Sequence, residues 1–344
     1  MRIAVLNNCV PFLRGGAEHL ADALVTQLRL RGHSAVAVGV PFRWETPNAV
    51  LESAFACFSL RVPNVDRVVA LKFPAYYVPH DDKVLWLLHQ YRQAYDLWGT
   101  PYGDIPDTVA GRGLRDAVRS ADDAVLRPLR IFTNSHVTSD RLMKFNRIAS
   151  TVLYPPLLDE SHFRCEAYGD YLFYPSRING AKRQLLAIEA MAHVRSRVKL
   201  VVAGAIEGDG GEDELRARIS RFGVGERVTL LAGYLAEAEK ARLFAGALGC
   251  VYIPYDEDSY GYVTLESYAS RKAVVTATDS GGTSIVVRDR ETGYVAEPEP
   301  KALAEAFDAL YCDRANAQRM GEAGHALVQR LRITWDDVIA TLVA

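Results

Sequence analysis

Residues 171–191, YLFYPSRINGAKRQLLAIEAM, show how this chain is built. The first five form a short apolar run that is typical of a buried parallel strand. A polar loop follows, and then apolar residues recur at helical spacing, namely Leu185, Leu186, Ile188 and Met191. A strand, a loop and a helix in this order predict one βα unit of a parallel sheet.

The same alternation runs from end to end and predicts an α/β protein with two parallel sheets. Buried strands are expected in the first half at residues 3–6, 35–40, 68–71, 84–88 and 131–133, and in the second half at 171–175, 199–203, 228–231, 250–253 and 273–276. Residues 90–123 do not fit this alternation. Their tyrosine, tryptophan and glycine content predicts an irregular insertion followed by a helix.

A domain boundary is predicted near residues 154–156, because the two prolines there remove strand hydrogen-bond donors and fix φ. We expect one Rossmann-like domain at residues 1–155 and a second at 156–333, with a C-terminal helix at 334–344 that could pack back on the first. Ligands of open parallel sheets bind beyond the carboxyl ends of the strands. The cleft between the two domains is therefore the expected site.

Composition and charge argue against several classes of protein. The 344 residues are 49% hydrophobic and carry a formal net charge of −2, so the chain can build two cores and offers nucleic acid no strong field. The five cysteines are scattered without a C-x-x-C spacing, which argues against disulfides and a zinc site and favours a reducing cytoplasm. No apolar run approaches the roughly 20 residues of a membrane span, and no signal-like segment is present, which leaves at most peripheral membrane contact.

Gly15 and Gly16 stand between the first predicted strand and a predicted helix. Adjacent glycines let a backbone approach a ligand, and the N–H groups and dipole at a helix start suit an anion. A plain tight turn is an equally good interpretation of this motif taken alone.

Arg177 and Lys182 flank the loop that follows the strand at 171–175. An arginine can bind two phosphate oxygens and a lysine adds a compact charge, so this pair is suited to a diphosphate. A solvated basic loop is the alternative. Because cations at the start of a helix are mildly unfavourable, we favour the ligand-binding interpretation.

The most informative stretch is residues 254–269, PYDEDSYGYVTLESYA. A helix is predicted to begin near Gly261, which places Asp258 before it and Glu266 in its second turn, so that both carboxylates can face one cleft. Carboxylates accept hydrogen bonds from sugar hydroxyls. Asp258 alone could be a helix cap, whereas a carboxylate at Glu266 inside an apolar turn is harder to explain by structure.

The start of the same helix offers a second feature, since the N–H groups of Gly261, Tyr262 and Val263 could hold a phosphate. Asp256 and Asp258 also form a D-x-D pattern, which holds a metal ion in another class of transferase. We expect no metal and no other cofactor here, because cationic side chains are already placed to take the charge of a diphosphate.

Taken together and in this order, these motifs resemble the retaining glycosyltransferases of the GT-B fold, family four, the glycosyl transferases group 1. The resemblance covers nearly the whole chain. It rests on the spacing from Asp258 to Glu266, on the loops around Gly15, Gly16, Arg177 and Lys182, and on residues 132–135, 152–156, 281–282 and 334–337. It implies two Rossmann-like domains facing across a cleft, the first for the acceptor and the second for a nucleotide diphosphate sugar.

The resemblance also implies roles for single residues. Arg177 and Lys182 bind the donor diphosphate, Glu266 binds the ribose, and Asp258 binds hydroxyls of the transferred sugar. The family usually has glutamate where Asp258 stands, which bears on the sugar that is held. Gly15 and Gly16 lie near the phosphates or the acceptor. The expected catalytic residues are Arg177, Lys182, Asp258 and His89, and on the residues alone His89 could equally be a packed histidine.

An aromatic cluster in the insertion has two interpretations. Tyr91, Tyr95, Trp98 and Tyr102 could form a satellite of the core or a platform for an acceptor sugar, because aromatic rings suit the apolar faces of sugars. We favour acceptor binding by Tyr91, Tyr95 and Trp98, since the insertion follows the end of a predicted strand.

The expected function is transfer of a sugar from a UDP- or GDP-type donor to a hydroxyl of a small molecule or glycan, with retention implied by the resemblance. No protein nucleophile stands out. Electrostatic stabilisation of the leaving phosphate is therefore the expected source of catalysis. Alternatives are a sugar-nucleotide epimerase or hydrolase of the same fold, and a catalytically silent module that binds a nucleotide sugar.

Overall fold

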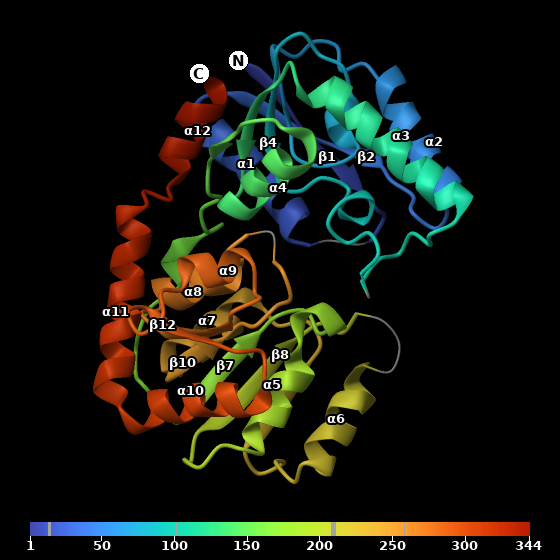
Figure 1. The fold of residues 1–344 in the computed structure, drawn as a ribbon. Helices are drawn as coiled ribbons and strands as arrows, with labels where there is room; N and C mark the ends of the chain where they lie inside the picture. Colours follow the sequence, from blue (N-terminus) through green and yellow to red (C-terminus); the bar gives the residue numbers. More distant parts are fainter. Residues whose placement is uncertain (13–14, 101, 208–210, 258) are drawn as a thin grey trace. The chain divides into compact units, whose positions relative to one another are not determined.

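The computed structural model describes residues 1–12, 15–100, 102–207, 211–257 and 259–344. They form two compact units (Figure 1). The first unit contains Met1–Leu158 and Ile333–Ala344, and the second contains Asp159–Arg332. Each unit is built around its own parallel sheet, as the alternation of strand and helix patterns predicts.

The first unit has a six-stranded sheet in the order β2-β1-β3-β4-β5-β6. Its strands are β1 (Arg2–Cys9), β2 (Ser34–Pro41), β3 (Arg67–Ala70), β4 (Lys83–Leu87), β5 (Arg130–Thr133) and β6 (Thr151–Val152). Its helices are α1 (Gly16–Leu30), α2 (Pro47–Ser59), α3 (Val109–Leu126), α4 (His136–Asn146) and α12 (Trp335–Val343), with 3-10 turns at Ala75–Tyr77 and Arg92–Ala94.

Alternate residues of these strands enter two different cores, because successive side chains of a strand point to opposite faces of the sheet. Ile3 and Val5 of β1 pack in a core with residues of α1 and α12. Ala4 and Leu6 pack in the other core, with residues of α2, α3 and α4. Helices therefore cover both faces of the first sheet.

Helix α12 brings the end of the chain into the first unit (Figure 1). Val338, Ile339 and Leu342 are buried in the core that α1 also lines. Trp335 Nε1 donates a hydrogen bond to the carbonyl of Leu157 at 2.9 Å, which ties the helix to the segment after β6. The first unit is thus assembled from two separate parts of the sequence.

The second unit also has a six-stranded sheet, in the order β12-β11-β10-β7-β8-β9. Its strands are β7 (Tyr171–Pro175), β8 (Lys199–Gly204), β9 (Val228–Ala232), β10 (Gly249–Val251), β11 (Ala273–Ala277) and β12 (Gly293–Ala296). Its helices are α5 (Gln184–Met191), α6 (Gly211–Arg221), α7 (Glu237–Gly246), α8 (Tyr262–Ala269), α9 (Gly282–Val286), α10 (Pro300–Cys312) and α11 (Arg314–Arg330), with 3-10 turns at Glu160–His162 and Gly180–Lys182.

All ten predicted strands are present, since each carries a short apolar run of the kind that predicts a strand. The strand predicted at 250–253 ends earlier, at Val251. The insertion is confirmed, since α3 begins only at Val109. No helix among the described residues has both the length and the apolar character to cross a membrane.

Candidate functional site

The site of the second unit lies at a reversal in strand order. Strands β8 and β9 follow β7 in the chain and extend the sheet laterally in one direction from it. Strand β10 pairs with the other edge of β7, and β11 and β12 extend the sheet from there in the opposite direction. Such a switch point leaves a crevice outside the carboxyl ends of two adjacent strands. Arg177 and Lys182 follow β7, and the acidic loop at 254–261 follows β10, so both predicted loops meet at this point.

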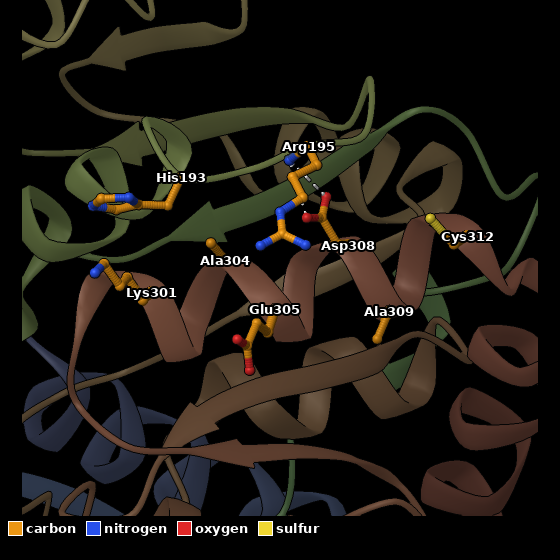
Figure 2. Close-up of a pocket in the computed structure, with 8 residues that line it drawn as sticks. All are labelled: His193, Arg195, Lys301, Ala304, Glu305, Asp308, Ala309 and Cys312. Carbon is orange, nitrogen blue, oxygen red and sulfur yellow. Dashed lines mark hydrogen bonds between the residues drawn. The ribbon is translucent and has the colours of Figure 1, made fainter.

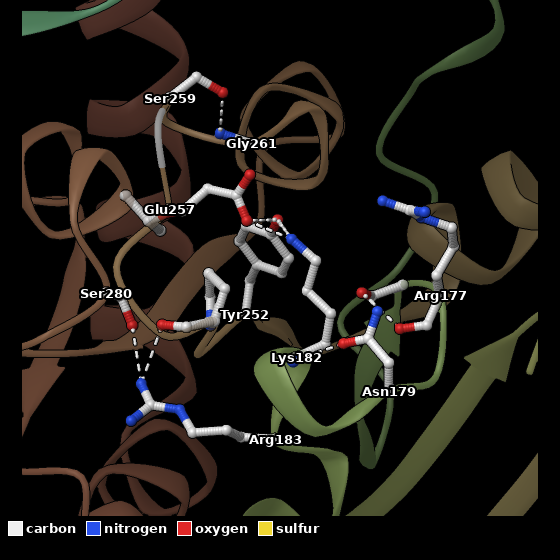
Figure 3. Close-up of polar contacts among 12 residues, drawn as sticks. Arg177, Asn179, Lys182, Arg183, Tyr252, Glu257, Ser259, Gly261 and Ser280 are labelled. Atoms are coloured by element: carbon white, nitrogen blue, oxygen red, sulfur yellow. Dashed lines mark hydrogen bonds and ion pairs between the residues drawn. The ribbon is translucent and has the colours of Figure 1, made fainter. Parts of the chain in front are cut away.

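Lys182 and the start of α8 converge on the hydroxyl of Tyr252 (Figure 3). Lys182 Nζ donates to the Tyr252 hydroxyl at 3.0 Å. A Cβ atom added to Gly261, the residue before α8, would lie 2.2 Å from a Tyr252 ring carbon and 2.9 Å from its hydroxyl. Gly261 also has φ of +70°, so glycine is required there both for its conformation and for this close approach.

Each of the two predicted diphosphate-binding cations has a glutamate partner. Arg177 forms an ion pair with Glu207, and its side chain is 52% exposed. Lys182 forms an ion pair with Glu257, and its side chain is 14% exposed. The sequence interpretation assigns no role to either glutamate. Glu257 lies in the acidic loop that the sequence already indicates as part of the site, whereas Glu207 belongs to none of the sequence motifs.

The acidic loop is clamped by the turn that begins α9. Gly282 N–H donates to the carbonyl of Glu257, and Asp256 N–H donates to the carbonyl of Asp279, both at 2.9 Å. Gly281 has φ of +59°, and a Cβ atom on it would lie 2.4 Å from the carbonyl oxygen of Glu257. The glycine pair that follows β11 therefore fixes the backbone of the acidic loop by close contact.

Arg183 also holds the acidic loop in place, a role that the sequence does not predict. Its guanidinium donates to the carbonyls of Ile253 and Pro254, at 2.7 and 2.9 Å. It also binds both carboxylate oxygens of Asp279, at 2.8 and 2.7 Å. Arg183 thereby joins the loops after β7, β10 and β11, which leaves Arg177 and Lys182 as the cations of this loop that face the candidate site.

Glu266 lies inside α8, where the sequence predicts a carboxylate among buried neighbours. Its side chain is 8% exposed, and its Oε1 accepts a hydrogen bond from Lys240 Nζ of α7 at 2.7 Å. Burial raises the pKa of Glu266 above its usual value, although Lys240 opposes this shift. The pKa of Lys240 is also raised, but for a different reason. Burial alone would lower the pKa of this lysine, and its carboxylate partners Glu266 and Glu237 outweigh that effect.

The remaining predicted residues of this region divide into two groups. Tyr262 and Val263 form the first turn of α8, and the phenolic oxygen of Tyr262 is buried without a hydrogen-bond partner among the described residues. Asp258 lies outside the described residues. In the part of the chain that the structure describes, no three His, Cys, Asp or Glu side chains gather as a metal site would require.

In the first unit, the start of α1 is engaged by the protein itself. Gly15 N–H donates to Glu18 Oε2 at 2.7 Å, and Glu18 Oε1 lies 3.5 Å from Lys72 Nζ. Burial favours protonation of Glu18, but Lys72 and the Gly15 N–H outweigh it and lower the pKa. Glu18, three residues on, therefore caps the N–H of Gly15, as the alternative of a plain tight turn allows, and a role of Gly15 toward an anion stays a prediction. Gly16 is the first residue of α1.

His89 follows β4 and so lies at the carboxyl edge of the first sheet, the same edge as the Gly15 loop after β1. Its side chain is partly exposed, and its Nδ1 lies 2.7 Å from the carbonyl oxygen of Gln90. This contact orients the imidazole ring without enclosing it. His89 is thus placed where a ligand of the first unit could reach it.

The aromatic cluster is divided between core and surface. Tyr95 is only 4% exposed, and its hydroxyl donates to Asp122 Oδ2 at 2.7 Å. Asp122 also accepts hydrogen bonds from the hydroxyls of Tyr76 and Tyr77, at 2.9 and 2.7 Å. The prediction that Tyr95 contacts an acceptor is wrong, because this buried carboxylate draws its hydroxyl into the core.

Tyr91 also belongs mainly to the core, since its ring stacks on Phe73 with centroids 5.0 Å apart. Trp98 is partly exposed, and the Arg115 guanidinium lies 5.0 Å from its ring centroid. Tyr102 is 39% exposed. Of the three aromatic residues proposed for acceptor binding, Trp98 is the one whose ring is not packed into the core of the first unit.

A separate pocket of about 450 Å³ lies in the second unit (Figure 2). It is formed by α10 and the loop between α5 and β8, and its lining includes Arg195, Lys301 and Asp308. That loop leads into the beginning of β8, so the pocket lies at the amino edge of the sheet, opposite the loops after β7 and β10. It contains none of the predicted site residues.

Residues 167–326 match the family model described as glycosyl transferases group 1. The human alpha-1,3/1,6-mannosyltransferase ALG2 is 28% identical over 167 residues, which are 45% of this chain and 39% of that protein. A D-inositol 3-phosphate glycosyltransferase of Mycobacterium ulcerans is 30% identical over 174 residues, 50% of this chain and 37% of that protein. The aligned region spans about two fifths of the length of these curated relatives.

Solved structures resemble the chain over nearly its whole length. Sucrose-phosphate synthase of Thermosynechococcus elongatus has a TM-score of 0.79 at 17% identity, covering 99% of this chain and 97% of that one. HepE of Anabaena, solved in complex with UDP-glucose, has a TM-score of 0.72 at 15% identity, covering 100% and 99%. With the two parallel sheets, these similarities support an α/β two-domain GT-B fold. The family match adds support for a group 1 glycosyltransferase.

Proposed function

We propose that this chain is a retaining, metal-independent glycosyltransferase. It moves a sugar from a nucleotide diphosphate sugar, of UDP or GDP type, to a hydroxyl of a small molecule or glycan. The observation that carries the proposal is the convergence of Lys182 and the start of α8 on the Tyr252 hydroxyl at the β7–β10 switch point. A cation and a helix start at one point are suited to a phosphate group.

In this proposal each residue acts on one part of the donor. Arg177 and Lys182 neutralise the diphosphate, and Glu266 accepts hydrogen bonds from two ribose hydroxyls. Asp258 holds hydroxyls of the transferred sugar. As the bond from the anomeric carbon to the phosphate oxygen breaks, the two cations stabilise the growing negative charge, and the leaving phosphate takes the proton of the acceptor hydroxyl.

The names of the similar proteins agree with this chemistry. One is a mannosyltransferase, one a glycosyltransferase acting on inositol 3-phosphate, and one was solved with UDP-glucose. They support hexosyl transfer from a nucleotide sugar. In this proposal the acceptor binds to the first unit, near His89 and Trp98.

The test is a screen of UDP- and GDP-sugars by thermal shift, followed by turnover of each stabilising donor with a panel of hydroxyl acceptors. A donor at 100 times its Kd should add about 2.7 kcal/mol to the free energy of unfolding. We expect glycosylated product and an equal amount of nucleoside diphosphate. Nucleoside diphosphate without glycosylated product would instead indicate a hydrolase, and binding without turnover a silent binding module.

A further inference from the structure

The two cations proposed to bind the donor diphosphate are each paired with a carboxylate of a neighbouring loop. Figure 3 shows the pair of Lys182 with Glu257. Glu207 accepts from Arg177 through Oε1 and from Asn179 Nδ2 through Oε2 at 2.6 Å. Glu257 accepts through Oε2 from Lys182 Nζ and from the Tyr252 hydroxyl, the latter at 3.1 Å. Each glutamate thus accepts hydrogen bonds from the same protein groups that would donate to a phosphate oxygen.

Both glutamates have a fixed backbone and a side chain that can turn toward solvent. Glu207 N–H donates to the carbonyl of Ile178 at 3.0 Å, and the Glu257 carbonyl accepts from Gly282 N–H at 2.9 Å. Their side chains are 41% and 23% exposed, respectively. A ligand can therefore displace either carboxylate by a change of side-chain rotamer, without moving the loops that form the site.

The exchange is chemically favourable for one class of ligand. A diphosphate carries more negative charge than a single carboxylate, and its oxygens can bond two cations at once. When the Glu257 carboxylate leaves, the Tyr252 hydroxyl also becomes a donor to the ligand, since it now donates to that carboxylate. A diphosphate offers one phosphate group for each of the two cations, whereas a ligand with a single phosphate group offers one in all.

We propose that Glu207 and Glu257 are internal anions that hold Arg177 and Lys182 in the donor-free protein and are displaced together by a diphosphate. This inference rests on the proposed function, and it adds that the two glutamates set donor affinity. Glu257 keeps the partly enclosed Lys182 paired with a carboxylate between turnovers, and Glu207 does the same for Arg177. Each glutamate thereby weakens the binding of a phosphate group that must displace it.

The test measures binding of inorganic pyrophosphate and of UDP to the intact chain by calorimetry. The variants are Glu257→Gln, Glu207→Gln and the double variant. We expect each single substitution to tighten pyrophosphate binding about fivefold, equivalent to about 1 kcal/mol, because the ligand no longer competes with a carboxylate. Orthophosphate should gain the same factor from a single substitution, so the preference for pyrophosphate should stay unchanged in the single variants. In the double variant pyrophosphate gains at both cations and orthophosphate at one, so the preference should widen.

Glu189→Gln is the matched control. Glu189 of α5 pairs with Arg218 of α6, and these side chains are 25% and 27% exposed. The substitution therefore also removes a carboxylate from a half-buried arginine, which keeps Glu214 at 3.8 Å, but in a different place from the candidate site. It should leave pyrophosphate affinity unchanged. A melting temperature for each variant shows that the fold is kept.

The outcomes separate this inference from the proposed function. Weaker or unchanged pyrophosphate binding in both glutamine variants, or no pyrophosphate binding by any of the proteins, overturns the inference even if the wild type transfers sugar. Tighter pyrophosphate binding in the variants supports it. If no nucleotide sugar is then turned over, the proposed function fails while the displacement of the two glutamates stands.

Discussion

Replacing Glu266 by glutamine tests the ribose-binding role most directly. The substitution keeps the size of the side chain and one acceptor oxygen, and it removes the charge. If Glu266 accepts hydrogen bonds from two ribose hydroxyls, each charge-assisted bond contributes about 1.5–3 kcal/mol. Weakening them should lower donor affinity at least about tenfold, since 1.4 kcal/mol corresponds to that factor.

The structure also predicts what this substitution does to stability. Glu266 loses its ion pair with Lys240, but Lys240 keeps a second partner, because its Nζ lies 3.0 Å from Glu237. Burial already raises the pKa of Glu266, which means that its charged form is costly in the fold. Removing that charge relieves the cost, so we expect the free energy of unfolding to change by less than about 2 kcal/mol.

Lys240→Gln is the matched control, because it breaks the same ion pair and leaves the carboxylate in place. It should destabilise the protein more, by about 3–5 kcal/mol, since it leaves a buried charge without its partner. Donor titration and thermal melting on both variants complete the experiment. Unchanged donor affinity in Glu266→Gln, or equal loss of affinity in both variants together with a collapse in melting temperature, would show that Glu266 is structural.

Trp98→Ala should raise the KM for acceptor more than the KM for donor, since its ring is stacked by Arg115 but not enclosed; equal effects would return it to a packing role. Transfer should continue in EDTA, because Arg177 and Lys182 supply the positive charge, and activity lost to EDTA and restored by Mn²⁺ or Mg²⁺ would contradict this. Burial raises the pKa of Asp122 from its usual 3.8 to about 6, so stability from its protonation is lost as pH rises through that value. Between pH 8 and pH 5 the wild type should therefore gain about 1.5 kcal/mol relative to Asp122→Asn in urea unfolding, and a constant difference would refute the assignment.

The sequence predicts strands well where burial on both faces produces an apolar run. It does not predict β6, which has two residues, or β12, whose four residues are short of such a run. Loops at strand ends are also predictable, so the sequence is enough to assign Arg177 and Lys182 to the loop after β7, which lies at the switch point. Their order along the chain is enough for that inference.

The sequence does not predict contacts between residues that are far apart in the chain. Glu207 is 30 residues from Arg177, and Asp279 is 96 residues from Arg183, so neither pair produces a local pattern. The error at Tyr95 has the same origin. An exposed ring and a buried ring have the same spacing in the sequence, and only the distant Asp122 decides between them.

The return of α12 to the first unit bears on how the protein is made. A domain at the beginning of a chain usually folds first while the rest is still being synthesised. Here Val338, Ile339 and Leu342 complete a core whose other members include Trp86 and Leu24, which are made 252 and 314 residues before Val338. The first unit must wait on the ribosome with an unfilled face, so a nascent chain stalled before residue 333 should recruit holding chaperones that the finished protein does not need.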